Sequence, residues 1–452
     1  MKSIICFSSL LFFLLCCQSK QPDTAMVRLI TLDPGHFHAA LVQKTMYAGI
    51  DSNIYVYAPG GQDLQEHLAR IASYNQRADN PTRWNEVVYS GSDFLEKMLL
   101  DKKGNVVVLA GNNQKKTEYI KASVDAGLNV LADKPMAINA LDFEILRQSF
   151  AEAETKKLIL YDIMTERSEI TTILQRELSM NSALFGILEK GTPENPAVTK
   201  ESVHHFYKYV SGSALKRPAW FFDTEQQGEG IVDVTTHLVD LIQWECFPEQ
   251  SIDFLKDIRI NTAKRWPTPI MLSQFTEVTG LKSYPEFLQK EVQDTMLNVY
   301  SNGEINYVIK GVHAKVSVTW NYKAPEGTGD THYSIMRGTK ANLIIRQGKD
   351  QNYKPILYIE PLIKDPGFSP VVDSAMIVIQ KTYPGITAVN EGSVWKVNIP
   401  DQYKISHEDH FAQVMQRFLE YLKNGNMPAW EVPNMLAKYY TTTRAFEMAS
   451  QK

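Results

Sequence analysis

Hydrophobic positions in the first third of the chain follow two alternating patterns. Continuous apolar runs, typical of strands in a parallel sheet that is covered on both faces, occupy residues 27–32, 53–57, 87–89, 105–110, 128–131 and 157–161. Segments with apolar residues three or four positions apart, which predict amphipathic helices, lie between and after them at 36–47, 63–72, 93–100, 116–126, 141–154 and 165–178. This alternation predicts an α/β fold with a Rossmann-like parallel sheet over residues 26–165.

The rest of the chain has a different hydrophobic pattern. Alternating apolar and polar positions predict strands at 203–210, 305–309, 313–320, 332–336, 341–345 and 356–360, and helical spacing recurs at 283–290, 407–423 and 432–448. Strands that follow each other without helices between them favour an antiparallel sheet. We therefore predict a second, α+β domain over residues 166–452, built on an open, mainly antiparallel sheet and ending in C-terminal helices.

Residues 1–25 are predicted to be a lipoprotein signal peptide and tether. Lys2 precedes an apolar run at 4–15, which is too short to span a bilayer and ends in Leu14-Leu15-Cys16-Cys17. That ending resembles a bacterial lipobox with Cys17 as the lipidated residue; the alternative is an ordinary secretory signal with incidental cysteines. We expect a cell-envelope protein that meets the membrane only through its lipid. The residue after Cys17 is Gln18 and not the aspartate that would signal retention at the inner membrane, so we favour the outer membrane.

Composition and charge limit the partners and the cysteine chemistry. The 452 residues are 44% hydrophobic and 22% charged, with a net charge of -4 and basic residues only in short pairs, which disfavours nucleic-acid binding. Four cysteines are present. Removal of the signal and lipidation of Cys17 would leave only Cys246 as a thiol, so we expect neither disulfides nor a cysteine metal site.

The segment 228–244 carries the first candidate chemistry. Asp233, His237, Asp240 and Trp244 are spaced by four, three and four residues, so a helix would place them on one face. A histidine between two carboxylates can be held in one tautomer and serve as an acid or base. From the spacing alone we favour the other interpretation, a buried histidine that its aspartate neighbours satisfy.

A second motif follows the predicted strand 128–131. Asp133, Lys134 and Pro135 would lie at the carboxyl edge of the parallel sheet, where such folds bind ligands. Together with the Gly228–Gly230 pair, Asp233 and His237, this motif resembles the Gfo/Idh/MocA oxidoreductases, the family of glucose-fructose oxidoreductase and inositol dehydrogenase. The resemblance covers nearly the whole chain after Met26.

The resemblance implies an activity and a site. It implies that Lys134 contacts both nicotinamide and substrate, that His237 is the acid/base, and that Asp233 binds substrate. The expected function is an NAD- or NADP-dependent oxidoreductase acting on a sugar or cyclitol hydroxyl, with redox-assisted glycoside cleavage as a variant and a homo-oligomer as the family's analogy. The alternative is a non-catalytic carbohydrate-binding or scaffold lipoprotein that retains the fold.

The cofactor turn departs from the family pattern. Residues Asp33 to His38 stand where the family has Gly-x-Gly-x-x-Gly, and only Gly35 is kept. The expected cofactor-binding residues are Gly35, His36, Phe37, His38, Asn112, Asn113 and Lys134. His36 or His38 could donate to a phosphate. A metal role for the two histidines lacks a third ligand nearby in the sequence, so no metal is predicted.

Two further segments contain candidate polar and aromatic residues. Lys216 and Trp220 belong to an aromatic and basic cluster just before Gly228, which could line a sugar site or simply pack. His407 and His410 flank two acids at the start of a predicted helix, where acids have a structural reason to occur.

Overall fold

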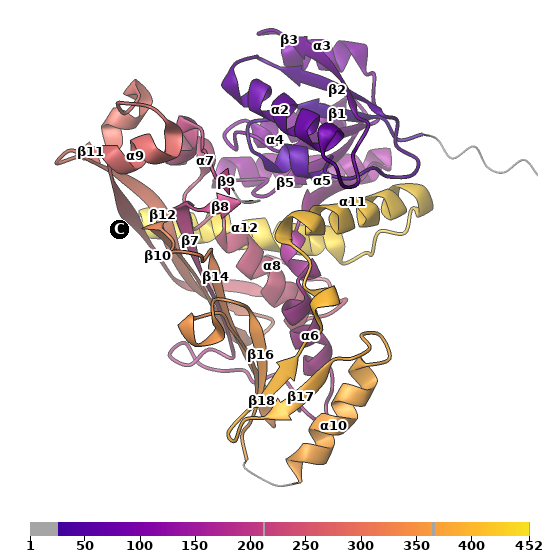
Figure 1. The fold of residues 1–452 in the computed structure, drawn as a ribbon, viewed down its shortest axis with the longest axis vertical. Coiled ribbons are helices and arrows are strands. Elements are labelled where there is room, and N and C mark those ends of the chain that lie inside the picture. Colours follow the sequence, from indigo (N-terminus) through magenta and orange to yellow (C-terminus); the bar gives the residue numbers. More distant parts are fainter. Residues whose placement is uncertain (1–25, 211–212, 364–366, 452) are drawn as a thin grey trace, which may run out of the picture.

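The first sheet is parallel and has six strands. The computed structural model describes residues 26–210, 213–363 and 367–451. The sheet has the order β3-β2-β1-β4-β5-β6 (Figure 1). Every residue of β1 and β4 is buried, as their continuous apolar runs predict. The strands are β1 (Leu29–Leu32), β2 (Asn53–Ala58), β3 (Asn85–Ser90), β4 (Val106–Leu109), β5 (Asn129–Asp133) and β6 (Leu160–Ile163). The order reverses between β1 and β4, which makes their carboxyl ends the switch point of the sheet.

Helices connect these strands much as predicted, with one exception. They are α1 (His38–Leu41), α2 (Gln62–Gln76), α3 (Phe94–Asp101), α4 (Lys116–Asp125) and α5 (Ala140–Lys156). The prediction of a helix over 36–47 is wrong because α1 has only four residues. The carbonyl groups of residues 42, 43 and 44 accept hydrogen bonds from the side chains of Tyr47, Trp84 and Arg77. Those side chains take the acceptors that a longer helix would use.

The second sheet carries the other half of the molecule. Its ten strands follow the order β10-β12-β13-β7-β14-β15-β16-β18-β17, with β11 paired to β12. Only β7 and β13 pair in parallel. The predicted strands correspond to β7 (Val198–Tyr207), with its short continuation β8 (Tyr209–Val210), β12 (Met296–Ile309), β13 (Val312–Lys323), β14 (Thr331–Arg337), β15 (Ala341–Arg346) and β16 (Ile356–Pro361). The predicted fold class, a Rossmann-like sheet followed by a mainly antiparallel sheet, is confirmed.

Several elements of this half were not predicted. They are β9 (Ser213–Ala214), β10 (Ile258–Met271), α7 (Thr224–Gln227), α9 (Leu272–Thr279), β11 (Val292–Gln293), α10 (Phe368–Ile379), β17 (Thr387–Asn390) and β18 (Trp395–Asn398). Strand β10 contains two register shifts, which interrupt the alternation that would reveal it. The helix predicted at 283–290 is a 3-10 turn, Glu286–Glu291. In α10 exposed Ile377 and Val378 break the single apolar face.

Helices hold the two sheets together. The inner helices are α6 (Ile170–Ser179) and α8 (Thr235–Cys246), and α11 (His407–Asn424) and α12 (Glu431–Ser450) lie between them and the parallel sheet (Figure 1). Apolar residues of α11, among them Phe411 and Phe418, belong to the same core as the parallel strands. The C-terminal helices therefore contribute to the Rossmann core although they follow the second sheet in sequence.

A buried network of charges crosses this junction. The Lys438 ammonium of α12 contacts Asp162 at 2.6 Å and Asp240 at 2.8 Å. Arg167, in the 3-10 turn Thr165–Ser168, binds Asp240 with two 2.7 Å hydrogen bonds and also contacts Glu431 at 3.0 Å. These five side chains come from β6, that turn, α8 and α12, so their pairing fixes α8 relative to the parallel sheet.

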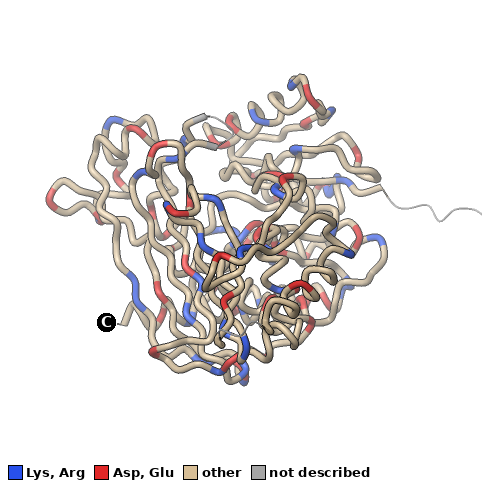
Figure 2. Tube along the Cα trace, turned by 60° about the horizontal axis from the view of Figure 1, so that its bottom comes forward, with Lys and Arg blue, Asp and Glu red and all other residues tan. Residues whose placement is uncertain are grey.

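Charges of both signs are interspersed along the described chain (Figure 2). Among the described residues, no helix combines the length and the apolar composition that a bilayer crossing requires. The predicted lipidation at Cys17 lies outside the described residues.

Candidate active site

The candidate site forms where the carboxyl end of β5 faces the start of α8. Lys134 directly follows β5, and its Nζ lies 2.5 Å from Asp233 Oδ1, with both side chains largely buried. Gln227 donates to the other carboxylate oxygen of Asp233 at 3.0 Å. Buried Lys116 of α4 donates to the Asp133 carbonyl at 3.0 Å and so fixes the end of β5. Burial lowers the pKa of Lys116 to about 8.

Asp233 and His237 do not share a helix. Asp233 lies in the turn before α8, which begins at Thr235, whereas His237 lies in its first turn. Asp240 points into the buried charge network, where it pairs with Arg167 and Lys438. The predicted carboxylate–imidazole–carboxylate stripe is therefore wrong, because Asp233 precedes the helix and the two acids pair with different cations.

His237 is left without the expected partner. Its Nδ1 is buried and makes no hydrogen bond among the described residues, so the interpretation of a histidine satisfied by its aspartate neighbours is also wrong. Burial, reinforced by the nearby charge of Lys134, lowers the pKa of His237 to about 4. The imidazole is therefore neutral at pH 7 and can accept a proton.

Two residues near His237 were not predicted to belong to the site. Glu166 Oε1 lies 3.2 Å from Nδ1 of His407, the first residue of α11, and both groups act electrostatically on His237. Burial alone would raise the pKa of Glu166, but contact with His407 holds it well below its ordinary value. No local sequence signal joins these residues, because they are brought together from the segment after β6 and from the C-terminal helices.

The predicted cofactor turn connects β1 to α1. Asp33 adopts φ 47°, a conformation that favours glycine, and its carboxylate accepts from the Tyr119 hydroxyl at 3.0 Å. A Cβ on Gly35 would lie 3.0 Å from an Asp63 oxygen and 3.2 Å from the Trp220 ring. Gly35 is thus the residue that allows Asp63 and Trp220 to cover the turn.

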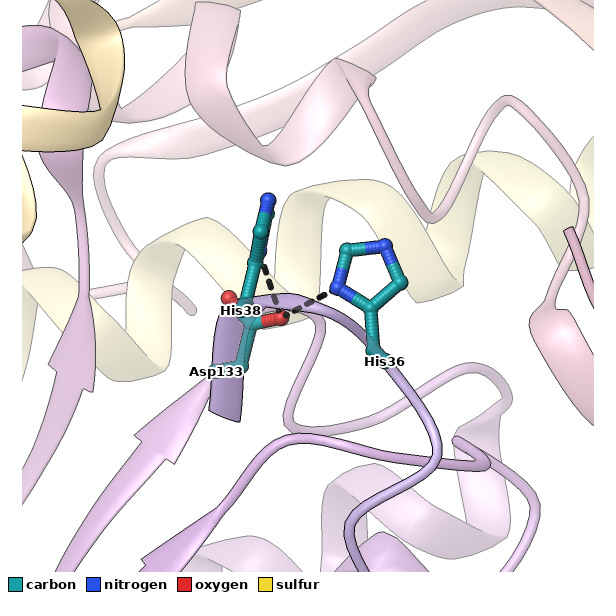
Figure 3. Close-up of side chains that lie close together, drawn as sticks. All are labelled: His36, His38 and Asp133. Atoms are coloured by element: carbon teal, nitrogen blue, oxygen red, sulfur yellow. Dashed lines mark hydrogen bonds and ion pairs between the residues drawn. The ribbon is translucent and has the colours of Figure 1, made fainter. Parts of the chain in front are cut away.

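His36 and His38 turn toward the end of β5. Their Nδ1 atoms lie 3.6 Å and 2.9 Å from the same Asp133 oxygen (Figure 3). The two imidazoles contact each other with centroids 4.0 Å apart, and the predicted Phe37 packs on both rings, with centroids 4.6 Å and 4.5 Å away. The turn, the end of β5 and Lys134 therefore form one contiguous site.

A small pocket of about 20 Å3 lies beside this turn. Its cationic lining is Arg70, Lys216 and Arg217, and its acidic lining is Asp63 and Glu66. Burial raises the pKa of Asp63 to about 6. The lining of the turn therefore carries charges of both signs.

The other predicted binding residues lie on the same side of the site. Trp220 donates to Asp63 at 2.8 Å, and Lys216 lines the pocket while it donates to the Glu277 carbonyl at 2.7 Å. Both therefore lie beside the cofactor turn. The amides of Asn112 and Asn113 donate across the domain boundary, to the Gln226 side chain and the Gln227 carbonyl, each at 2.7 Å.

Comparison with known proteins identifies the family. Residues 174–450, more than half of the chain, match the family described as "Putative oxidoreductase C terminal domain", and residues 55–161 match "Oxidoreductase family, NAD-binding Rossmann fold". The chain belongs to the Gfo/Idh/MocA oxidoreductases. The predicted resemblance and the predicted oxidoreductase with an NAD-binding Rossmann fold are thereby confirmed. A search of curated proteins found no match.

Solved structures share the whole fold. A crystal structure described as a "putative oxidoreductase", from Parabacteroides merdae ATCC 43184, is 57% identical, with a TM-score of 0.93 over 95% of this chain and 98% of its own. Levoglucosan dehydrogenase, in complex with NADH and levoglucosan, is 11% identical, with a TM-score of 0.60 over 94% and 97%. A protein described as a "putative myo-inositol dehydrogenase", from Sinorhizobium meliloti 1021, is 13% identical, with a TM-score of 0.54 over 94% and 98%. The last two show a shared fold.

The residues present fit a nicotinamide cofactor in two respects. Lys134 directly follows β5 at the carboxyl edge of the sheet, where Rossmann folds bind their cofactors, and the neutral His237 of α8 lies near its charge. Arg70 and Lys216 are cationic residues beside Gly35 that would lie near the phosphates. The turn itself differs from the family pattern, since its outer two glycine positions hold Asp33 and His38.

Proposed function

We propose that this protein is an NAD(P)-dependent oxidoreductase that acts on a hydroxyl group of a sugar or cyclitol. The proposal rests mainly on one observation. An ammonium–carboxylate pair, Lys134 with Asp233, lies near the neutral imidazole of His237, whose Nδ1 has no hydrogen-bond partner among the residues that the structure describes. Oxidation of a carbinol requires a group that takes the hydroxyl proton, and a neutral imidazole meets that requirement. The bound nicotinamide would supply the hydride chemistry.

Each residue has a separate task in this proposal. His237 accepts the hydroxyl proton of the substrate during oxidation and returns it during reduction. Lys134 donates a hydrogen bond to the reacting oxygen and so stabilises the negative charge that develops on it. Asp233 holds Lys134 in place and, through its carboxylate, accepts hydrogen bonds from neighbouring substrate hydroxyls. Gln227 fixes the orientation of that carboxylate.

The substrate class is supported by the chemistry of the site and by proteins with the same fold. A polar, largely buried cluster with a carboxylate acceptor suits a polyhydroxylated molecule. Levoglucosan dehydrogenase and the described myo-inositol dehydrogenase share the fold. Leu14-Leu15-Cys16-Cys17 resembles a lipobox, and this resemblance supports the further proposal that the enzyme is anchored at the bacterial cell envelope by a lipid on Cys17. Mass spectrometry of the intact mature protein tests that anchoring.

The first experiment is on the cofactor. We would denature natively purified protein, identify released NAD(H) or NADP(H) by mass spectrometry, and titrate both cofactors into the protein without bound nucleotide. The expected result is stoichiometric release or micromolar binding of one of them. If neither cofactor binds at millimolar concentration, the proposal is wrong.

The second experiment is a panel of sugars and cyclitols, assayed for hydride transfer and for glycoside cleavage. For the substrate found, His237→Gln is expected to lower kcat by roughly 10²–10⁴-fold, because it removes a general base. Lys134→Met is expected to lower kcat/KM as well. His313→Ala, on β13 in the second sheet, is the matched control and is expected to retain parental kinetics. Parental turnover in both site variants would refute the assigned roles.

A further inference from the structure

Three potential ligands from distant parts of the sequence converge beside the cofactor turn. His36 and His38 belong to the segment after β1, and Asp133 ends β5. One donor atom from each lies within 4.8 Å of the others. In Figure 3 the two imidazole Nδ1 atoms face the same oxygen of Asp133. The third ligand that the local sequence lacks is thus supplied by the neighbouring part of the sheet.

The spacing matches a coordination sphere. Ligand atoms about 2.1 Å from a metal at tetrahedral angles are about 3.4 Å apart. The two nitrogen–oxygen distances, 3.6 Å from His36 and 2.9 Å from His38, lie on either side of that value. Two of the three ligand spacings are thus close to those of a metal site, and all three donor atoms lie within 4.8 Å of one another.

The hydrogen bonding leaves one ligand atom unpaired. His38 makes a 2.9 Å hydrogen bond to Asp133 Oδ2, whereas the buried Nδ1 of His36 has no hydrogen-bond partner within the described part of the chain. Burying an unpaired polar nitrogen costs about 1–3 kcal/mol. A metal ion would satisfy all three atoms at once, which hydrogen bonding among the three does not.

A neighbouring cation is already paired with an acid. Lys134 directly follows Asp133, and its ammonium lies 2.5 Å from Asp233 Oδ1, which reduces its repulsion of a metal ion beside the turn.

We propose that His36, His38 and Asp133 bind a divalent transition-metal ion of the zinc class. Two imidazoles and one carboxylate suit such an ion better than they suit Ca²⁺ or Mg²⁺, which prefer oxygen ligands. Three protein ligands leave at least one coordination position open, as in catalytic rather than structural zinc sites. That position is available to water or to an oxygen of a bound small molecule.

The test measures the metal directly. Protein without a histidine tag is stripped with a chelator, titrated with ZnCl₂ by calorimetry, and loaded with Co²⁺ so that visible absorption bands report coordination. We expect one site per chain, and expect His38→Ala and Asp133→Asn each to weaken binding 10-fold or more. His313→Ala, which alters a histidine of β13, is the control and should bind like the parent.

Two outcomes would overturn the proposal: no saturable Zn²⁺ binding by parental protein, or unchanged binding in both ligand variants. His36→Gln, which changes the partly exposed histidine of the set, provides a second test if a buried substitution prevents folding. Nicotinamide binding is titrated separately in stripped and loaded protein. A missing metal with intact cofactor binding refutes this inference alone, and a bound metal without cofactor refutes only the proposed function.

Discussion

Replacing Lys438 with methionine tests whether the buried charge network joins the two halves of the molecule. Lys438 is fully buried, and its ammonium is shared by Asp162 and Asp240 at 2.6 Å and 2.8 Å. Methionine has nearly the same length and lacks the charge, so the substitution removes the ion pairs with little change in packing.

The magnitude follows from what remains after the substitution. Asp240 keeps its two 2.7 Å hydrogen bonds from Arg167, whereas Asp162 keeps only the 2.8 Å hydrogen bond from the Tyr439 hydroxyl. Removal of one partner of a buried ion pair costs about 3–5 kcal/mol, because the other charge stays buried without compensation. We therefore expect Lys438→Met to lower the free energy of unfolding by about 3–5 kcal/mol.

The assay is urea unfolding at pH 7, followed by circular dichroism and by tryptophan fluorescence. Both probes are needed because a chain of this size can unfold in more than one step. The expected result is a lower urea concentration at the midpoint of unfolding. The contacts between α8 and the parallel sheet should be lost at a lower urea concentration than in the parent.

The matched variant is Lys438→Met combined with Asp162→Asn. This pair removes the orphaned carboxylate and keeps an acceptor for Tyr439, so it should regain about 1–3 kcal/mol relative to the single variant. If Lys438→Met is as stable as the parent, or if the second substitution restores nothing, the network does not join the two halves as argued.

Three further predictions concern single residues around the site. Gly230→Ala should cost more than about 2 kcal/mol of stability, because its Cβ would lie 1.7 Å from a backbone oxygen of β12, whereas Gly329→Ala, with open space around it, should cost little in the same melts. As the pH is lowered from 6.5 to about 4, His237 takes up a proton in the unfolded chain before it does so in the folded chain. The free energy of unfolding should therefore decrease over this range by up to about 3 kcal/mol because of this residue. His237→Gln should flatten that part of a curve of stability against pH. Trp220→Phe removes the hydrogen bond to Asp63, and burial raises the pKa of Asp63 to about 6. The substitution should lower the free energy of unfolding by about 1–3 kcal/mol. This loss should be larger at pH 8, where the carboxylate is charged, than at pH 5. A loss that does not change with pH would contradict the last prediction.

The sequence alone predicted the elements whose hydrophobic pattern is regular. The continuous apolar runs of β1 and β4 can be satisfied only by a sheet that is covered on both faces, and all eight residues of these strands are buried. Strand β10 was missed because its two register shifts break the alternation. The length of the first helix was overestimated because the carbonyl groups just after α1 accept hydrogen bonds from the side chains of Tyr47, Trp84 and Arg77.

For the site, the sequence alone identified single candidate residues. Lys134 and His237 were predicted from a sheet-edge motif and a helical spacing, and the structure places both at the junction of the two halves. The partners of these residues were decided by the tertiary structure. Asp240 lies three positions from His237 and yet pairs with Arg167 and Lys438, because burial forces each charge toward the nearest opposite charge.

The convergence of His36, His38 and Asp133 also separates what the sequence determines from what the tertiary structure decides. The sequence places two histidines two residues apart, which is too few ligands for a metal. Asp133 lies 95 residues beyond His38 and reaches it because β1 and β5 both pair with β4 and end at the same edge of the sheet. Local patterns thus determined which strands form and which groups they carry. Only the order of the strands in the sheet decided which of those groups meet, since that order depends on contacts between residues far apart in the chain.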